Sequence, residues 1–297
     1  MKRDDHLTAL LDDISDFCPA ARAGGLKAMA EFLARTLAPV PAAVIALPGR
    51  LLSEPPRFNI RKLRPGKRHA VIVVNGFWSK GETDTADWGG TLESRFGHAA
   101  WYHLDWEACR DPLVYSKDAL CSLGKPAAIG GIGALDAGLA FAFHGAMHHA
   151  ERSGKLLAQA IRRTPGWTFT LAGHSLGGRV IHYALQELAQ EAQPRIDNAY
   201  LLGAAVGGGG KDDACWGRAA GAVAGKIFNC HSSKDRVLGL VYRGVNAGLS
   251  QPAGHAPIRL AHERIVNIDC SDLIQGNFCH FDWKSRFMDI LERTARH

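Results

Sequence analysis

The chain has 297 residues, of which 46% are hydrophobic and 22% are charged, and this balance excludes an intrinsically disordered protein. The net charge of +6 comes from scattered lysines and arginines without a run of five like charges, so we expect no binding to nucleic acid. The seven cysteines have irregular spacing and form no C-x-x-C pair, which predicts free thiols in a reducing compartment.

The first 60 residues are predicted to form an N-terminal helical extension. Apolar side chains recur at helical spacing from Leu7 to Phe17, and several prolines follow between Pro39 and Pro56. The acidic start of the chain lacks the apolar run of a secretory signal. We therefore expect a cytoplasmic protein that can associate with a membrane, and export without a signal peptide stays open.

From residue 61 onward, apolar β-branched runs alternate with amphipathic segments. The predicted strands are 69–77, 99–106, 167–173, 198–206, 225–232 and 263–271. The predicted helices are 85–96, 146–162, 176–190 and 213–224, with a further helix beginning near Asp282. This alternation predicts an α/β domain over residues 61–297, with a mostly parallel central sheet and helices on both faces.

One segment, Pro126–Met147, is long and apolar enough to raise the question of a membrane span. It has 22 residues and a single charge, Asp136. Five glycines and the cost of burying Asp136 in a bilayer, about 2.5–3.5 kcal/mol, weigh against a span. We predict an apolar insertion at about 124–147 that forms a buried or surface helix and could cover the functional site as a lid.

The segment Trp167–Val180 contains a G-x-S-x-G pattern centred on Ser175. The serine follows an apolar strand and precedes an amphipathic helix, which is the context of a nucleophile held on a sharp turn. Gly173 and Gly177 would let the strand and the helix approach each other closely. The N–H groups that begin the helix would face an oxyanion formed beside Ser175.

The stretch GHSLGG after an apolar strand resembles the nucleophile elbow of the α/β-hydrolase superfamily, especially of its lipases and esterases. Other stretches, among them VVNGFWS, YHLDWEA and VNIDCSDLIQGNFCHFDW, resemble the hydrolase domain of the transmembrane-and-coiled-coil-type proteins. The resemblance covers about residues 69–290. It implies the α/β-hydrolase fold and a chain order of serine, acid and histidine.

This chain order selects candidates for the base and the acid. His280 follows the last predicted strand and is the preferred base, with His255 and His262 as alternatives. Asp235 follows the preceding strand and is the preferred acid. Rival acids are Asp269, Asp272, Asp212 and Asp213. Asp235 could instead cap a helix that begins near Arg236.

The oxyanion hole of this mechanism needs two backbone N–H donors. Leu176, directly after the serine, would give one, and Phe77 in the loop after an early strand would give the other, with Trp78 as the alternative. Gly76 permits the tight turn there. The sequence lacks the H-G-G-G form of this loop, having Asn75 before Gly76.

Two other motifs are set aside. The glycines 207–210 do not have phosphate-loop spacing and are predicted to form a mobile loop beside the site. The histidines at 144, 148 and 149 lack an H-E-x-x-H pattern, so we expect no metal and no cofactor.

The sequence therefore predicts a serine hydrolase that cleaves carboxylic esters, with an ester or lipid as substrate and peripheral contact with a membrane. A thioesterase, acyltransferase or peptidase on the same residues is the alternative within catalysis. A non-catalytic, membrane-associated binding module is the alternative outside it. The sequence assigns no protein partner.

Overall fold

The computed structural model describes residues 57–77, 79–108, 133–242, 251–275 and 279–297. The predicted helical extension, apart from its last residues, and the first part of the predicted apolar insertion lie outside these ranges. Of the segment 126–147, residues 126–132 lie outside these ranges and residues 133–147 are helical, and its role as a lid stays a prediction.

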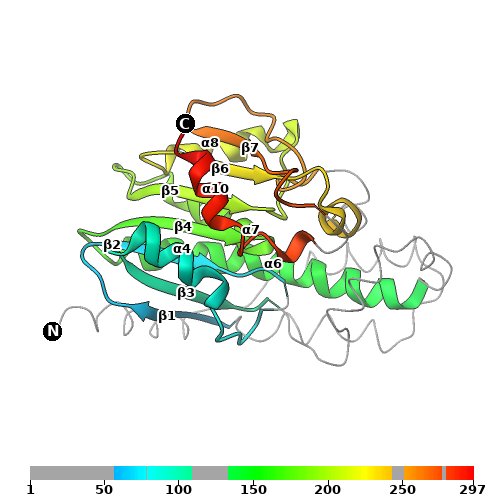
Figure 1. Ribbon diagram of the computed structural model, residues 1–297, viewed down its shortest axis with the longest axis horizontal. Helices are drawn as coiled ribbons and strands as arrows, with labels where there is room; N and C mark the ends of the chain where they lie inside the picture. Colours follow the sequence, from blue (N-terminus) through cyan, green and yellow to red (C-terminus); the bar gives the residue numbers. More distant parts are fainter. Residues whose placement is uncertain (1–56, 78, 109–132, 243–250, 276–278) are drawn as a thin grey trace.

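A seven-stranded sheet forms the centre of the described part (Figure 1). Its strands are β1 (Phe58–Arg64), β2 (His69–Val74), β3 (Ala100–Trp106), β4 (Thr168–His174), β5 (Ile196–Leu202), β6 (Ile227–His231) and β7 (Ile265–Asp269). The order across the sheet is β1-β3-β2-β4-β5-β6-β7, and every pair is parallel except β1 with β3. All six predicted strands and the mostly parallel sheet are confirmed.

The edge strand β1 was not predicted. Its sequence, FNIRKLR, has only Phe58 and Ile60 buried in the core, and three cations interrupt the apolar pattern. Phe58 pairs with Trp106 and Ile60 pairs with Leu104. The sheet thus begins at Phe58, three residues before the domain start that the sequence predicts at 61.

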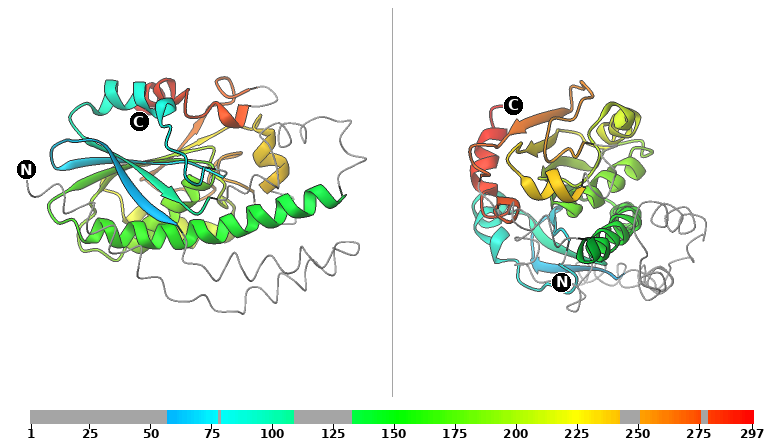
Figure 2. Two further views of the ribbon diagram at one scale, coloured as in Figure 1. Left: turned by 90° about the horizontal axis from the view of Figure 1, so that it is seen from below. Right: turned by 90° about the vertical axis from the view of Figure 1, so that its right-hand side faces the viewer.

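Helices cover both faces of the sheet, as Figure 2 shows. One face carries α4 (Ala86–Phe96) and α10 (Phe287–Thr294), and the other carries α6 (Gly133–Arg162), α7 (Leu176–Leu188) and α8 (Asp213–Gly221). Each face has its own buried apolar cluster. Strand residues alternate between the two, so that Val71 and Val73 face α4 and α10 while Ile72 and Val74 face the other side.

The helix α6 differs from its predicted extent. The sequence predicts a helix over 146–162 and a separate apolar helix before it, whereas α6 begins at Gly133 and joins the described part of the apolar segment to 146–162 without a break. Its first half projects beyond the carboxyl ends of the parallel strands (Figures 1 and 2). Its second half packs tightly on α7, since a Cβ at Gly154 would lie 2.5 Å from the carbonyl oxygen of Val180. Within the described ranges, no helix combines the length and the apolar character needed to cross a bilayer.

The last helix, α10, begins at Phe287 and not near Asp282 as predicted. Residues 282–286 form turns, in which the N–H of Arg286 donates to the carbonyl of Asp282. Phe287 then packs edge-on against Trp88 of α4, with ring centroids 5.6 Å apart. This contact joins α10 to α4 on the same face of the sheet.

Candidate active site

Ser175 occupies a strained turn between β4 and α7. Its φ of 55° and ψ of −120° lie in a region that residues with a side chain rarely adopt. A Cβ at Gly173 would lie 2.6 Å from the backbone of Gly177, and a Cβ at Gly177 would lie 2.1 Å from the carbonyl oxygen of Val74. The predicted role of these two glycines in bringing strand and helix together is confirmed.

Ser175, His280 and Asp235 form a continuous hydrogen-bonded chain. His280 Nε2 lies 3.0 Å from Ser175 Oγ, and His280 Nδ1 lies 2.7 Å from Asp235 Oδ2. The exposed fractions are 3% for Ser175, 5% for His280 and 0% for Asp235. These residues come from three separate segments, the end of β4, the short 3₁₀ helix η4 (Cys279–Phe281) and the loop after β6, and all three were selected from the sequence.

The carboxylate of Asp235 uses both oxygens. Oδ2 accepts from His280 and also from the indole Nε1 of Trp283 at 2.9 Å, and Oδ1 accepts from the N–H of Leu238 at 3.1 Å. Burial alone would raise the pKa of Asp235, but His280 and these donors lower it below its ordinary value. Asp235 therefore stays ionised beside His280, and it also caps the following turn, as the alternative interpretation predicted; its role as the catalytic acid stays a prediction.

His174, the last residue of β4, contacts the backbone of His280. Its Nε2 lies 2.8 Å from the carbonyl oxygen of His280, and the two rings have centroids 4.8 Å apart. A carbonyl oxygen can only accept, so Nε2 of His174 carries the proton. Burial, His280 and Lys284 hold the pKa of His174 well below its usual range, and the ring is neutral.

The loop after β2 passes directly against the nucleophile. A Cβ at Gly76 would lie 2.6 Å from Ser175 Cβ and 3.3 Å from Ser175 Oγ. Phe77 follows Gly76 and Leu176 is the first residue of α7, so the two predicted oxyanion donors belong to the segments on either side of Ser175. Trp78, the alternative donor, lies outside the described residues.

Asn75 holds this loop through three hydrogen bonds. Its Oδ1 accepts from Trp88 Nε1 at 2.8 Å, its Nδ2 donates to Glu82 at 2.9 Å, and its carbonyl accepts from Trp106 Nε1 at 2.9 Å. Ser79 Oγ donates to the carbonyl of Gly76. On the other side of the loop, the ring of Phe77 lies 5.3 Å from that of Phe143 in an edge-on contact.

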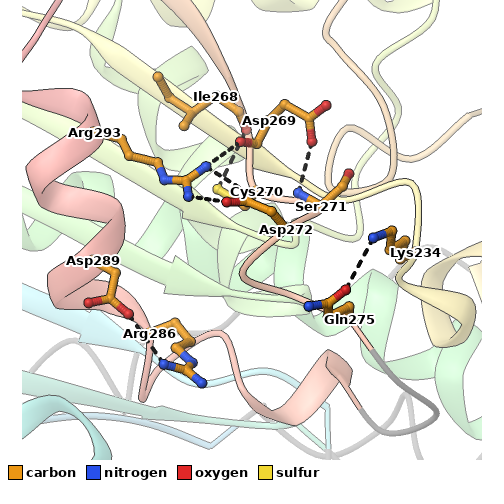
Figure 3. Close-up of polar contacts among 10 residues, drawn as sticks. All are labelled: Lys234, Ile268, Asp269, Cys270, Ser271, Asp272, Gln275, Arg286, Asp289 and Arg293. Atoms are coloured by element: carbon orange, nitrogen blue, oxygen red, sulfur yellow. Dashed lines mark hydrogen bonds and ion pairs between the residues drawn. The ribbon is translucent and has the colours of Figure 1, made fainter.

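The rival acids make other contacts. Figure 3 shows Arg293 donating to the carboxylate of Asp272 and to the carbonyl of Asp269, while the carboxylate of Asp269 accepts from the N–H of Ser271. The hydrogen bond from Arg293 lowers the pKa of Asp272 to about 2. Both carboxylates thus belong to a surface network between β7 and α10. Asp212 and Asp213 lie at the start of α8.

The rival bases lie in the connection between η3 (Leu238–Tyr242) and β7. Nδ1 of His262 accepts from the N–H of Arg264 at 3.1 Å. The ring of His255 packs against Gly239, and a Cβ at Gly239 would lie 3.3 Å from it. His280 is the histidine that the structure brings to Ser175.

Gly207 and Gly208 are buried and make hydrogen bonds, whereas Gly209 and Gly210 are more exposed, and the mobility predicted for this loop stays a prediction. Gly208 donates to Gln251 and accepts from Arg259, and Gly207 accepts from Trp216 Nε1. Among the described residues, no group of three or more histidine, cysteine or acidic side chains could hold a metal ion.

Sequence reasoning did not identify three supporting residues: Asn75, His174 and Trp283. His174 carried a local signal, because it is a titratable residue at the end of an otherwise apolar strand. Trp283, three residues after His280, carried none, since its partner Asp235 lies 48 residues away.

Residues 121–296 match the family described as "Protein of unknown function (DUF726)". The chain is 28% identical over 247 residues to an uncharacterized membrane protein of Schizosaccharomyces pombe, covering 75% of this chain and 31% of that protein. It is 31% identical over 153 residues to transmembrane and coiled-coil domain-containing protein STS1 of Oryza sativa subsp. japonica, covering 50% of this chain and 22% of that one. The chain thus spans less than a third of the length of these relatives, and the predicted resemblance to transmembrane-and-coiled-coil-type proteins is confirmed.

Solved structures with similarity include a Pyrobaculum calidifontis esterase, with 15% identity, a TM-score of 0.41 and coverage of 81% of both chains. Another is a predicted CIB-like hydrolase from Thermoplasma acidophilum, with 14% identity, a TM-score of 0.40 and coverage of 82% of this chain and 94% of that one. The strand order and the strand–turn–helix around Ser175 are those of the α/β-hydrolase fold, which is confirmed as the fold class.

Proposed function

The chain belongs to the DUF726 family of proteins of unknown function, and we propose that it is a serine hydrolase that cleaves carboxylic esters. The observation that carries this proposal is the buried hydrogen-bonded chain from Ser175 through His280 to Asp235. A nucleophile, a base within hydrogen-bond reach and a third group that orients the base are the parts that acyl transfer requires.

In the first step, Ser175 Oγ attacks the ester carbonyl carbon while His280 Nε2 takes the hydroxyl proton. Asp235 keeps the proton of His280 on Nδ1 and stabilises the imidazolium that forms. The N–H groups of Phe77 and Leu176 receive the oxyanion. The tetrahedral intermediate then collapses, the C–O bond to the alcohol breaks, and His280 gives its proton to the leaving oxygen.

In the second step, water hydrolyses the acyl-enzyme. His280 accepts a proton from the water as its oxygen attacks the acyl carbon, and returns that proton to Ser175 Oγ when the carboxylic acid leaves. Each proton that His280 takes up is given back within the same step, so the proposed reaction uses only side chains and backbone N–H groups of the protein and includes no cofactor.

We further propose an ester with an apolar acyl chain, including lipid esters, as the substrate. The apolar contact between Phe77, one residue after Gly76, and Phe143 of α6 supports this substrate class. It gives the part of the site that faces α6 an apolar character. Membrane association belongs to the same proposal: two relatives are named as a membrane protein and a transmembrane protein.

The test is labelling by a fluorophosphonate, which reacts with activated serines. Wild-type protein should label and Ser175→Ala should not. Ser153→Ala is the matched control, since Ser153 is a fully buried serine on α6 whose hydroxyl has no hydrogen-bond partner within the described part of the chain. Labelling of Ser175→Ala would overturn the assignment of Ser175 as the nucleophile.

Absence of labelling in the wild type would favour the binding module instead. If the wild type labels, turnover of a panel of esters, thioesters and peptides by the purified protein without the probe then separates the ester hydrolase from a thioesterase, an acyltransferase or a peptidase. Faster turnover of thioesters or peptides than of esters would overturn the ester assignment.

A further inference from the structure

We propose that His174 is a positioning residue that fixes His280 through its backbone carbonyl, an inference that rests on the proposed function. The geometry behind it is the 2.8 Å contact between His174 Nε2 and the carbonyl oxygen of His280. His174 is 6% exposed and directly precedes Ser175. One short stretch of β4 therefore carries the nucleophile and also holds the backbone of the base.

His280 needs such a support because its own element is short. It lies on η4, a 3₁₀ helix of three residues, which cannot set a side-chain position by its own hydrogen bonds. Asp235 and Ser175 contact the two ring nitrogens of His280. His174 restrains the main chain of His280 at its carbonyl oxygen, so that the ring stays within reach of Ser175.

The chemistry of His174 suits this role. Its Nε2 proton is committed to the carbonyl, and by strand alternation its side chain lies on the same face of the sheet as Ala172, towards α4 and α10. A neutral donor beside His280 adds no positive charge when His280 becomes imidazolium in each step. A lysine or arginine at this position would supply a donor but would oppose that imidazolium.

Three variants of the full chain separate the hydrogen bond from mere packing. Glutamine can present its amide N–H near the position of histidine Nε2, whereas the shorter asparagine cannot reach the carbonyl, and leucine has no donor. We expect His174→Leu and His174→Asn to lower kcat by about 10- to 100-fold through misplacement of the base, with KM changed less than about twofold. His174→Gln should keep kcat within about threefold of the wild type.

A second readout does not depend on turnover. In proton NMR, the hydrogen of His280 Nδ1 that is shared with Asp235 should give a low-field resonance. It should be present in the wild type and in His174→Gln, and broadened or lost in His174→Asn. If His174→Leu does not fold, the glutamine and asparagine pair decides the question alone.

The outcomes separate this inference from the proposed function. Ser175→Ala and His280→Ala are measured in the same series, and if both keep full turnover, the proposed function has failed. If they lose turnover while His174→Asn keeps wild-type kcat and the low-field resonance, the positioning role of His174 is overturned. Loss of kcat in His174→Gln to the level of His174→Leu, with normal thermal melting, would also overturn it.

Discussion

The two faces of the sheet support Ser175 in different ways. On the face of α4 and α10, three buried N–H donors bind groups next to the nucleophile: Trp88 to Asn75, Trp283 to Asp235 and His174 to His280. On the face of α6, one indole donor, Trp106 to the carbonyl of Asn75, lies with the edge-on apolar pair of Phe77 and Phe143. Hydrogen bonds are directional and hold particular atoms in place, whereas apolar contacts determine the size and shape of the space that the side chains leave. Most of these directional contacts lie on the face of α4 and α10, which we expect to set the geometry of the proposed reaction, and we expect the apolar pair on the face of α6 to shape the proposed substrate site.

The largest effect is expected from Asp235→Asn, which removes the carboxylate that accepts from His280 and Trp283. An amide can donate to His280 Nδ1 and would hold the histidine in the wrong tautomer, so kcat should fall by about 10⁴-fold. Steady-state ester hydrolysis measures this. Asp272→Asn is the control, because the carboxylate of Asp272 contacts Arg293 at the surface, and it should leave kcat unchanged. A kcat of Asp235→Asn within tenfold of the wild type would contradict the proposed acid.

The second-largest effect is expected from a variant of the loop after β2, which contains the proposed oxyanion donor Phe77. It tests whether hydrogen bonds on the face of α4 and α10 also hold this loop. Asn75→Ala removes the acceptor of Trp88 and the donor to Glu82. The loop should shift, and kcat/KM should fall by about 10²-fold. Stability should fall by about 1–3 kcal/mol, because a buried indole N–H is left unpaired, and thermal melting measures it.

Glu82→Gln is the matched control for the loop. It keeps an oxygen that can accept from Asn75 and should retain most of the activity. Equal losses in Asn75→Ala and Glu82→Gln would instead point to the charge of Glu82 as the important feature.

A third prediction concerns how buried histidines on the two faces of the sheet make the stability depend on pH. Burial, together with Arg179 and Arg218, lowers the pKa of His182 on α7 to about 3, from 6.5. The unfolded chain gains this proton below about pH 6.5 and the folded chain does not, so the free energy of unfolding falls as the pH is lowered towards 3. Between pH 7.5 and 5.0 this single group should cost about 2 kcal/mol.

His182→Leu should remove that part of the pH dependence, as measured by urea unfolding at both pH values. His103, which is buried on the other face with a pKa of about 4, is left unchanged as the internal comparison. The same loss of stability between the two pH values in His182→Leu and in the wild type would show that His182 does not carry the effect.

The smallest effect is expected on the face of α6, at the contact between Phe77 and Phe143. Phe143→Leu keeps an apolar side chain but removes the edge-on contact with Phe77. We expect kcat/KM for long-chain esters to fall by about fivefold, the equivalent of about 1 kcal/mol of apolar contact, with short-chain esters unaffected. An equal loss for both chain lengths would mean that this face also sets the geometry of the reaction.

Much of the fold was predictable because its signals are local. The buried strands β2 to β7 are short apolar runs, and Ser175 lies where one of them meets a helix. His280 and Asp235 could be chosen from chain order once the resemblance to the superfamily was recognised. The catalytic roles of these residues are proposals: labelling tests Ser175, and the turnover of His280→Ala and Asp235→Asn tests the base and the acid.

The rest depends on contacts between distant parts of the chain. The carbonyl that His174 contacts lies 106 residues further along the chain, and no periodicity in the sequence signals such a pair. The strand β1 was missed because an edge strand buries few side chains, and its cations hide the alternation. The sequence predicts a helix in the apolar segment and another over 146–162, whereas the structure joins them into one helix, α6, because the small residues and glycines of the apolar segment do not interrupt it.

The close approach of Gly76 to Ser175 also constrains how the two positions can vary during evolution. The contact that excludes a side chain at position 76 is made by Cβ of residue 175, 2.6 Å away, and not by its hydroxyl alone. Every residue except glycine has that carbon. A lineage that replaced Ser175 by alanine or cysteine would therefore still need glycine at 76, and this glycine should persist in relatives that have lost the serine.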